Sequence, residues 1–248
     1  MEYIDNERFL AARDRIIGKD HNTMGIGTLS EKNVHGILKY YFEPDDDNHE
    51  VALDGYFADI YNENGVIEIQ TRSFNRLREK LAVFLNQYPV TVVYPMASNT
   101  WVSRFDEGSG EILSRRKSPR HYSVYDAFIE LYRIKQYLNC EGLSIILVFM
   151  DVEEYRLSSR SRKVGRKTSD KYDKIPIGIT EIVSIERPED YLQFVPYELE
   201  NEFTSLQFAK ACGIGRQHAQ VVLNILNYVG AVERVGKKER NYLYKAKM

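Results

Sequence analysis

Cysteine, tryptophan and long apolar runs are scarce in this chain of 248 residues. The two cysteines, Cys140 and Cys212, lie far apart, which excludes a disulfide framework or a cysteine zinc cluster. The longest apolar run, 145–150, has six residues, whereas a membrane-spanning helix needs about 20. The first residues lack the basic and apolar pattern of a signal peptide. These absences predict a cytoplasmic protein with reduced thiols and no membrane partner.

Basic residues are missing from one stretch and concentrated in two others. Residues 43–70 contain nine acidic and no basic residues, whereas 156–174 and 204–248 each contain eight basic and two acidic residues. This distribution is compatible with a metal site among phosphate-binding surfaces, and the alternative is that each run is a solvated face. We predict that 156–174 is a mobile basic loop that holds the phosphate backbone of a nucleic acid.

The spacing of apolar residues predicts alternating helices and strands. We expect helices over 3–18, 31–42, 74–86, 124–139, 205–212 and 216–229. We expect strands over 49–61, 66–71, 90–94, 100–105, 111–114, 143–150, 176–185, 231–235 and 241–244. This order predicts an α/β fold with a mixed central sheet flanked by helices over residues 1–195, and a small second domain over residues 196–248.

A predicted hairpin brings two carboxylates together. Asn64-Gly65 is a strong hairpin turn signal between Asp59 and Glu68. If the loop centres on residues 63–64, Asp59 lies opposite Glu68, and if it centres on 64–65, Asp59 lies opposite Gln70. In both registers the three side chains share a face, because alternate strand residues point to the same side. Two carboxylates this close repel unless a cation or proton intervenes, and oxygen ligands suit Mg²⁺ or Mn²⁺.

The pattern Asp59-(eight residues)-Glu68-Ile69-Gln70, preceded by a helix that carries Glu31, resembles the PD-(D/E)XK nuclease superfamily. That superfamily includes archaeal Holliday-junction resolvases, RecB-type nucleases and many restriction endonucleases. The resemblance covers about residues 31–150 and implies a restriction-endonuclease-like fold. It implies that Asp59 and Glu68 are metal ligands and that Glu31 is an auxiliary acid.

The sequence departs from the superfamily at two positions. Gln70 replaces the lysine that positions or activates the attacking water, and Ala58 replaces the proline of the motif. Some restriction enzymes of the superfamily carry Glu-x-Gln and are active, so Gln70 is retained as a catalytic candidate that orients water. Arg72 and Arg76 are candidates for holding flanking DNA phosphates, and their alternative role is that of solvated helix charges.

In the last 45 residues, a helix at 205–212, a turn at 213–215, a helix at 216–229 and a basic hairpin follow one another. This order resembles a winged helix. Amide side chains can pair with adenine in the major groove, and basic residues at a hairpin tip can hold phosphates. The resulting DNA-binding candidates are Arg216, Gln217, Gln220, Asn224, Lys237, Lys238 and Arg240.

The sequence therefore favours a metal-dependent DNA endonuclease with a winged-helix DNA-binding domain, with Mg²⁺ or Mn²⁺ as cofactor and DNA as partner. One alternative is a non-catalytic DNA-binding or regulatory protein with a degenerate nuclease fold. Another is an interaction protein in which both domains contact protein partners. A homodimer is an open alternative for its assembly.

Overall fold

The computed structural model describes residues 4–20, 30–106, 109, 111–158 and 171–247. The chain forms two compact units from interleaved segments. The first unit comprises residues 1–50, 95–122 and 148–182, and the second comprises 51–94, 123–147 and 183–248. The sequence predicted a boundary at 195/196 between consecutive domains, and that boundary stays a prediction.

The described strands form a seven-stranded sheet and a three-stranded sheet. The larger sheet has the order β1-β2-β3-β4-β6-β7, with β5 paired to β4. It is mixed, because β2 and β3 are antiparallel whereas β3 and β4 are parallel. The predicted α/β fold with a mixed sheet flanked by helices is confirmed. Its strands are β1 (His49–Leu53), β2 (Tyr56–Asn62), β3 (Gly65–Ile69), β4 (Val90–Asp106), β5 (Ile112–Lys117), β6 (Leu143–Ser158) and β7 (Lys171–Ile185).

Several strand boundaries differ from the sequence prediction. The single strand expected over 49–61 is two strands, because Asp54 and Gly55 both adopt positive φ and form the turn between β1 and β2. Strand β4 continues past Tyr94 and Pro95, so the strand expected at 90–94 and the one expected at 100–105 are one element. Pro95 cannot donate a ladder hydrogen bond, but the strand pairs again with β5 from Trp101 onward.

The helix predicted over 124–139 is also broken. It consists of short 3₁₀ turns around α4 (Ala127–Leu131), and Ile134 has non-helical φ and ψ of −111° and 17°. Ile134 is completely buried, and residues 132–137 pack against α3 (Leu77–Phe84) and α6 (Arg216–Val229). Tertiary packing therefore outweighs the local helical periodicity.

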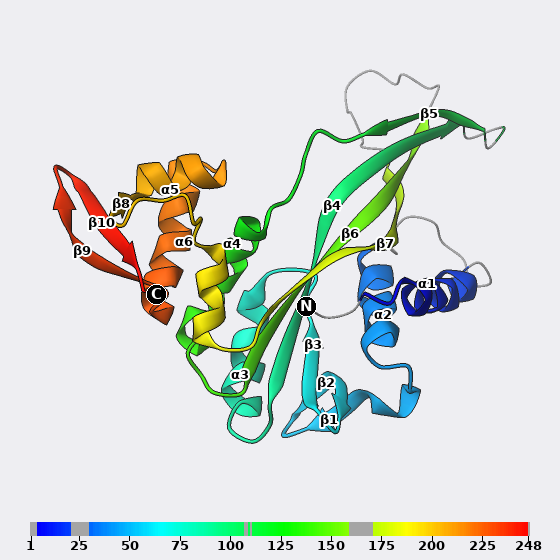
Figure 1. The fold of residues 1–248 in the computed structure, drawn as a ribbon. Coiled ribbons are helices and arrows are strands. Elements are labelled where there is room, and N and C mark those ends of the chain that lie inside the picture. Colours follow the sequence, from blue (N-terminus) through cyan, green and yellow to red (C-terminus); the bar gives the residue numbers. More distant parts are fainter. Residues whose placement is uncertain (1–3, 21–29, 107–108, 110, 159–170, 248) are drawn as a thin grey trace, which may run out of the picture. The chain divides into compact units, whose positions relative to one another are not determined.

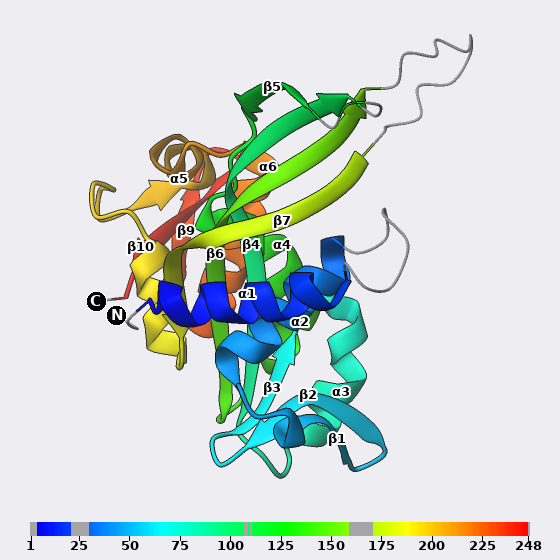
Figure 2. The ribbon, with the colours of Figure 1, turned by 90° about the vertical axis from the view of Figure 1, so that its right-hand side faces the viewer.

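In the first unit, α1 (Asn6–Asp20) and α2 (Ser30–Phe42) pack against each other (Figure 2). Phe9 of α1 and Ile37 and Leu38 of α2 are completely buried. The backbone amide of Ile179 in β7 donates a hydrogen bond of 3.2 Å to Asn6 Oδ1 at the start of α1. The two helices are thus tied to the sheet of their own unit.

In the second unit, α5 (Ser205–Cys212) and α6 are followed by the hairpin of β9 (Val232–Lys238) and β10 (Asn241–Ala246) (Figure 1). The small strand β8 (Phe203–Thr204) pairs with β10, which gives the smaller sheet the order β8-β10-β9. Thr204 caps α5 through a hydrogen bond from Gln207 N, and Gly213 ends it in the left-handed region. These elements follow the predicted order, although β9 extends three residues beyond the predicted Val235.

Two sequence predictions fall on parts of the chain that are not described. The predicted basic loop lies mostly at 159–170, outside the described residues. The prediction of a loop is wrong at both ends, because 156–158 belong to β6 and 171–174 to β7. Arg156 in β6 pairs with Glu154 at 2.6 Å. Glu31 lies in the first turn of α2, and its side chain is outside the described part of the structure.

Candidate functional site

The β2–β3 hairpin has the register in which its loop centres on residues 63–64. Ile60 pairs with Ile67 and Asn62 pairs with Gly65, and the same register continued by one residue places Asp59 opposite Glu68. The alternative register, with Asp59 opposite Gln70, is wrong. Gly65 fixes this turn, because its φ is +103° and an added Cβ would lie 2.3 Å from the Pro89 carbonyl oxygen.

The two carboxylates of this pair have different surroundings. The Glu68 side chain is buried, with 3% of the residue exposed, whereas Asp59 is half-buried. Asp59 Oδ2 accepts a hydrogen bond of 2.7 Å from the backbone amide of Ile69. This bond holds the Asp59 carboxylate against the end of β3.

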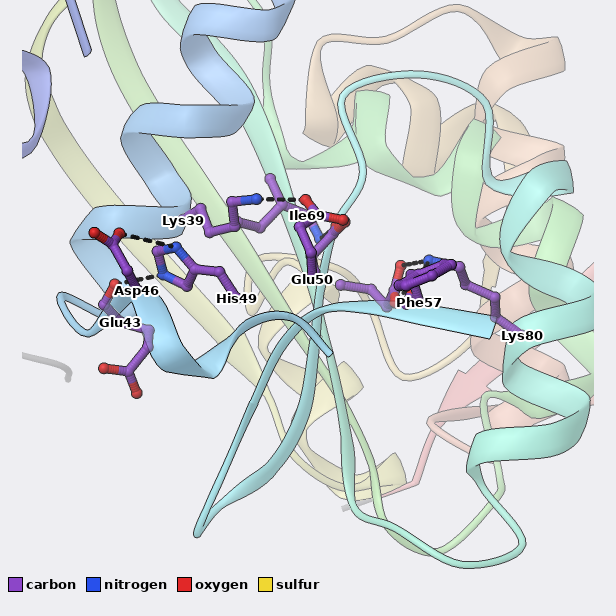
Figure 3. A network of polar contacts seen from close by, with 10 residues as sticks. Lys39, Glu43, Asp46, His49, Glu50, Phe57, Ile69 and Lys80 are labelled. Atoms are coloured by element: carbon purple, nitrogen blue, oxygen red, sulfur yellow. Dashed lines mark hydrogen bonds and ion pairs between the residues drawn. The ribbon is translucent and has the colours of Figure 1, made fainter. Parts of the chain in front are cut away.

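Lys80 of α3 occupies the site beside Glu68. Its ammonium donates to both Glu68 carboxylate oxygens, at 2.9 and 2.8 Å, and to the Phe57 carbonyl oxygen at 2.6 Å. Figure 3 shows the lysine reaching from its helix to Phe57 on β2. The sequence analysis did not place Lys80 in the site. A signal for it exists, since Lys80 adjoins Leu81 and lies three and four residues from Leu77 and Phe84 in the buried stripe of α3.

These neighbours act in opposite directions on Glu68. Burial and the nearby Asp59 carboxylate raise the pKa of Glu68 to about 7, although the Lys80 ammonium lowers it. A carboxyl group that titrates near neutrality is able to hold or release a proton at physiological pH.

The third member of the predicted triad lies just beyond β3. The Gln70 side-chain amide donates a hydrogen bond of 2.9 Å to the Ser73 carbonyl oxygen, which fixes the amide at the start of the segment leading to α3. Arg72 and Arg76 are exposed on the same segment. The phosphate-holding role of these two arginines stays a prediction.

Asp59 and Glu68 are the two carboxylates that the described residues bring together in this site. Among the described residues, no group of three or more His, Cys, Asp or Glu side chains is arranged to hold a metal ion. Magnesium is often held by one or two carboxylates together with water. Asp59 and Glu68 have the donor chemistry of Mg²⁺ or Mn²⁺ ligands, although the Lys80 ammonium contacts both Glu68 oxygens in this structure.

Other acidic residues of the stretch at 43–70 form ion pairs within the first unit. Glu50 pairs with Lys39 of α2, and Asp46 pairs with Arg15 of α1. The His49 ring lies 2.8 Å from the Glu43 carbonyl oxygen and 3.7 Å from Asp46 (Figure 3). These residues stabilise the turn after α2, so the acidic stretch divides into a local ion-pair cluster and the β2–β3 carboxylates.

The predicted DNA-binding residues of α6 differ in exposure. Gln217 and Gln220 are exposed, and Arg216 donates a hydrogen bond of 2.6 Å to Asn241 Oδ1 on β10. Asn224 is half-buried, and its side-chain oxygen accepts a hydrogen bond of 2.6 Å from Lys135. Helix α6 thus presents its first turns to solvent, while its later turns pack against the body of the second unit.

The hairpin after α6 is basic and exposed. Arg234 lies over the Tyr242 ring at 4.4 Å, and Lys237 lies over the same ring at 5.0 Å. The exposed residues at the hairpin tip include the predicted Lys237, Lys238 and Arg240.

None of the described helices combines the length and apolarity that a membrane span requires.

Comparison with known proteins assigns this chain to a family. An uncharacterized protein of Treponema pallidum (strain Nichols) is 30% identical over 169 residues, which are 68% of this chain and 64% of that protein. The chain thus spans less than two thirds of the length of this relative. No solved structure matches. A family model described as a domain of unknown function, DUF8091, matches residues 32–186. This match includes the β2–β3 carboxylates and covers more than half of the sequence, so the chain belongs to the DUF8091 family.

Proposed function

We propose that this protein is a metal-dependent DNA nuclease whose site is formed by Asp59, Glu68 and Lys80. The observation that carries the proposal is the opposed pair of carboxylates on β2 and β3, one of them buried beside a lysine ammonium. The order of a helix, three strands, a helix and a further strand around this pair supports a restriction-endonuclease-like arrangement.

The donor set favours Mg²⁺ or Mn²⁺ as cofactor. Both candidate ligands are carboxylates. Burial and then repulsion by Asp59 raise the pKa of Glu68, and a divalent cation would relieve the repulsion. Such a cation supplies a polarised phosphate oxygen and a water of lowered pKa. The Ile69 amide keeps Asp59 oriented towards the site, which reduces the reorganisation needed when substrate binds.

Lys80 supplies the positive charge that the nuclease motif carries at the position of Gln70. Its ammonium is fixed by Phe57 and Glu68, and it is therefore positioned to attract an anionic phosphate oxygen. Gln70 is neutral and cannot replace a cation, but its amide is anchored by Ser73 and can orient water.

We infer that the C-terminal elements bind DNA as a winged helix. The order α5, α6, β9, β10, with β8 paired to β10, supports this assignment. The contact surface consists of the first turns of α6, with Gln217 and Gln220 exposed, and of the basic β9–β10 tip. Amides there read base edges and the hairpin cations hold phosphates.

The decisive experiment is single-turnover cleavage of duplex, single-stranded and branched DNA in Mg²⁺, Mn²⁺ or Ca²⁺. We expect cleavage of at least one substrate with Mg²⁺ or Mn²⁺, and binding alone with Ca²⁺. Calorimetry of the wild type and Asp59→Asn with Mn²⁺ measures the metal site directly. Glu63→Gln is the matched control, because Glu63 is an exposed acid in the turn of the same hairpin. No Mn²⁺ binding and no cleavage by the wild type would contradict the proposal.

One observation favours a second function. The Lys80 ammonium contacts both Glu68 oxygens, so Glu68 is compensated by a cation from the chain itself. A protein that keeps this arrangement permanently would be a non-catalytic DNA-binding or regulatory protein with a degenerate nuclease fold. DNA binding without metal binding or cleavage would identify this alternative.

A further inference from the structure

Strand β5 is the most exposed strand of the larger sheet. All six of its residues, Ile112–Lys117, are exposed, and it pairs with β4 outside the main strand order. Residues 112–122 carry three arginines and one lysine and contain no acidic residue. The β4–β5 ribbon, defined here as residues 101–106 and 112–117, lies within the first unit (Figures 1 and 2).

Two arginines share one face of this ribbon. Arg104 pairs with Ser114, and Val102 pairs with Arg116, so Arg104 and Arg116 are diagonal neighbours. Diagonal residues on adjacent antiparallel strands lie about 7–8 Å apart. Both are exposed, and among the described residues neither forms a salt bridge. Two exposed guanidinium groups at this spacing can contact separate phosphates.

The opposite face is organised around the one tryptophan of the chain. Arg115 lies over the Trp101 ring at 4.2 Å and binds Glu153 through three hydrogen bonds of 2.9–3.2 Å. Ser103 also donates to Glu153. Lys117, the strand partner of Trp101, is exposed with its ammonium 5.9 Å from the ring. Glu153 therefore neutralises Arg115, while Lys117 adds a further cation to the ribbon.

We propose that the β4–β5 ribbon is a second DNA-binding surface, in which the exposed strand β5 meets the phosphate backbone of a duplex, with Arg104 and Arg116 on one face and Lys117 on the other. This proposal rests on the proposed DNA-binding function and adds a surface that is separate from the C-terminal hairpin in sequence. Charge complementarity carries it, because the planar fork of arginine binds phosphate in a bidentate manner. An alternative role for these charges is to prevent edge-to-edge pairing of strands. A single lysine is sufficient for that role, which does not require cations on both faces of the ribbon.

Trp101 provides a readout specific to this surface. It is the one tryptophan of the chain, and a phosphate that draws Lys117 away from the ring changes the charge next to the indole. The full-length protein is titrated with a 30-base-pair duplex in EDTA, so that no cleavage occurs. Trp101 fluorescence and the anisotropy of labelled DNA are followed together at several salt concentrations. We expect a saturable fluorescence change whose midpoint coincides with the anisotropy transition.

Charge removal then tests the arginines. Arg104→Gln/Arg116→Gln is expected to weaken binding about tenfold and to reduce the slope of log affinity against log salt by about 2, one unit for each phosphate contact. The matched control Lys32→Gln/Arg187→Gln removes the same charge from exposed positions and is expected to leave affinity within about twofold. Lys237→Gln/Lys238→Gln is expected to weaken binding but to leave the Trp101 change at saturation unaltered.

The outcomes separate this inference from the proposed function. Unchanged affinity and salt slope in Arg104→Gln/Arg116→Gln would overturn the proposal that the ribbon binds DNA. An anisotropy transition without a Trp101 response would overturn it too. A Trp101 response to anionic phospholipid vesicles but not to the duplex would also overturn it, in favour of a lipid surface. Cleavage that persists without the Trp101 response refutes the ribbon alone, and a normal response in a protein that never cleaves refutes the nuclease alone.

Discussion

Glu68 in the second unit and Glu153 in the first are both buried beside a cation, yet their pKa values are displaced in opposite directions. Each is less than a tenth exposed, and each contacts a basic side chain, Lys80 or Arg115 respectively. The pKa of Glu68 is raised to about 7, whereas the pKa of Glu153 is lowered. Burial raises the pKa of both groups and is the largest single influence on each, so the net direction depends on how far the other neighbours offset it.

The neighbours of Glu153 all favour its charged form. Hydrogen bonds from Arg115 and Ser103, and the charge of Arg115, outweigh burial. Glu68 receives an ammonium too, but Asp59 faces it with a second negative charge. A carboxylate whose charge is fully compensated, such as Glu153 beside Arg115, is typical of a structural ion pair. A carboxyl group that keeps its affinity for a proton or a metal, such as Glu68, is typical of a functional site. This contrast supports assigning function to Glu68 and a structural role to Glu153.

The largest expected effect comes from removing the negative charge of Asp59, which faces Glu68 and has no counterpart among the described groups that shift the pKa of Glu153. Asp59→Asn keeps an oxygen that accepts the Ile69 amide hydrogen bond, but it removes the charge of the proposed metal ligand and the repulsion on Glu68. We expect cleavage to fall by about 10³-fold or more, because a charged group that acts on the transition state is lost. We also expect the pKa of Glu68 to move down towards its usual range. Single-turnover kinetics and carboxyl ¹³C NMR titration measure the two effects.

Loss of cleavage without a downward movement of the Glu68 pKa would contradict the electrostatic account of the pair. The Glu63→Gln control is expected to retain both the cleavage rate and the Glu68 titration. Binding of DNA by the C-terminal elements is expected to persist in Asp59→Asn, which separates a catalytic defect from a folding defect.

The two glutamates also predict opposite pH dependences of stability. The folded protein keeps the Glu68 proton up to about pH 7, while the unfolded chain loses it near pH 4.5, where an unperturbed glutamate titrates. Over that interval the folded state binds more protons, so the free energy of unfolding falls as pH rises. The wild type is therefore expected to lose up to about 3 kcal/mol relative to Glu68→Gln, at about 1.4 kcal/mol for each unit of pKa.

For Glu153 the pH dependence of the free energy of unfolding has the opposite sign. Because its folded pKa is lowered, its contribution is present above the unfolded pKa and is lost as pH falls through the folded pKa. The advantage of the wild type over Glu153→Gln is thus expected to shrink on acidification. Urea unfolding of the three proteins between about pH 2.5 and 8 checks both directions, because the Glu153 effect falls below pH 4.5 and the Glu68 effect above it. Parallel curves for the wild type and Glu68→Gln would refute the assignment to Glu68.

The sequence predicted the carboxylate pair because strand alternation and a hairpin signal are local properties. The choice between the two registers was open, because it depends on the turn at Glu63-Asn64 and on the close approach of Gly65 to Pro89. Lys80 escaped prediction because its partner Glu68 lies twelve residues away, in a different element. A helical residue at the margin of an apolar stripe gives no local indication of the charge that it meets across the packing interface.

The fold shows the same division between local and tertiary information. The α/β order was predictable from apolar periodicity, whereas the extent of the long strands was not. Strand β4 runs through Pro95 because pairing with β5 stabilises its second half, and β5 itself has no buried side chain to mark it. Helix α6 shows apolar spacing that predicts its buried face, but the contact of Asn224 with Lys135 depends on packing between distant segments.

A smaller effect is expected from neutralising the two glutamates at constant pH. Glu153→Gln removes the charge from hydrogen bonds with Arg115 and Ser103, and hydrogen bonds to charged groups each contribute about 1.5–3 kcal/mol. We expect it to lower the free energy of unfolding at pH 7.5 by about 2 kcal/mol. Glu68→Gln is expected to raise it, by up to about 3 kcal/mol, because it removes a charge that burial and Asp59 both oppose. Equal losses in the two variants would show that Glu68 is also a structural ion pair.

The smallest effect tests whether the position of the lysine matters. Lys80→Met removes the ammonium that lowers the pKa of Glu68, so that pKa is expected to rise above 7 and cleavage to fall. Adding Gln70→Lys returns a cation to the motif position next to Glu68, on the same face of the hairpin. If the site requires a positive charge near the carboxylates but not specifically at Lys80, the double variant is expected to cleave about tenfold faster than Lys80→Met, which corresponds to ~1.4 kcal/mol. The pH profile of cleavage supplies the second readout, since a restored cation brings the apparent pKa of the site back down. Rescue of neither rate nor pH profile would mean that the hydrogen bonds from Lys80 to Phe57 and Glu68 hold α3 against the hairpin, and that the charge itself is incidental.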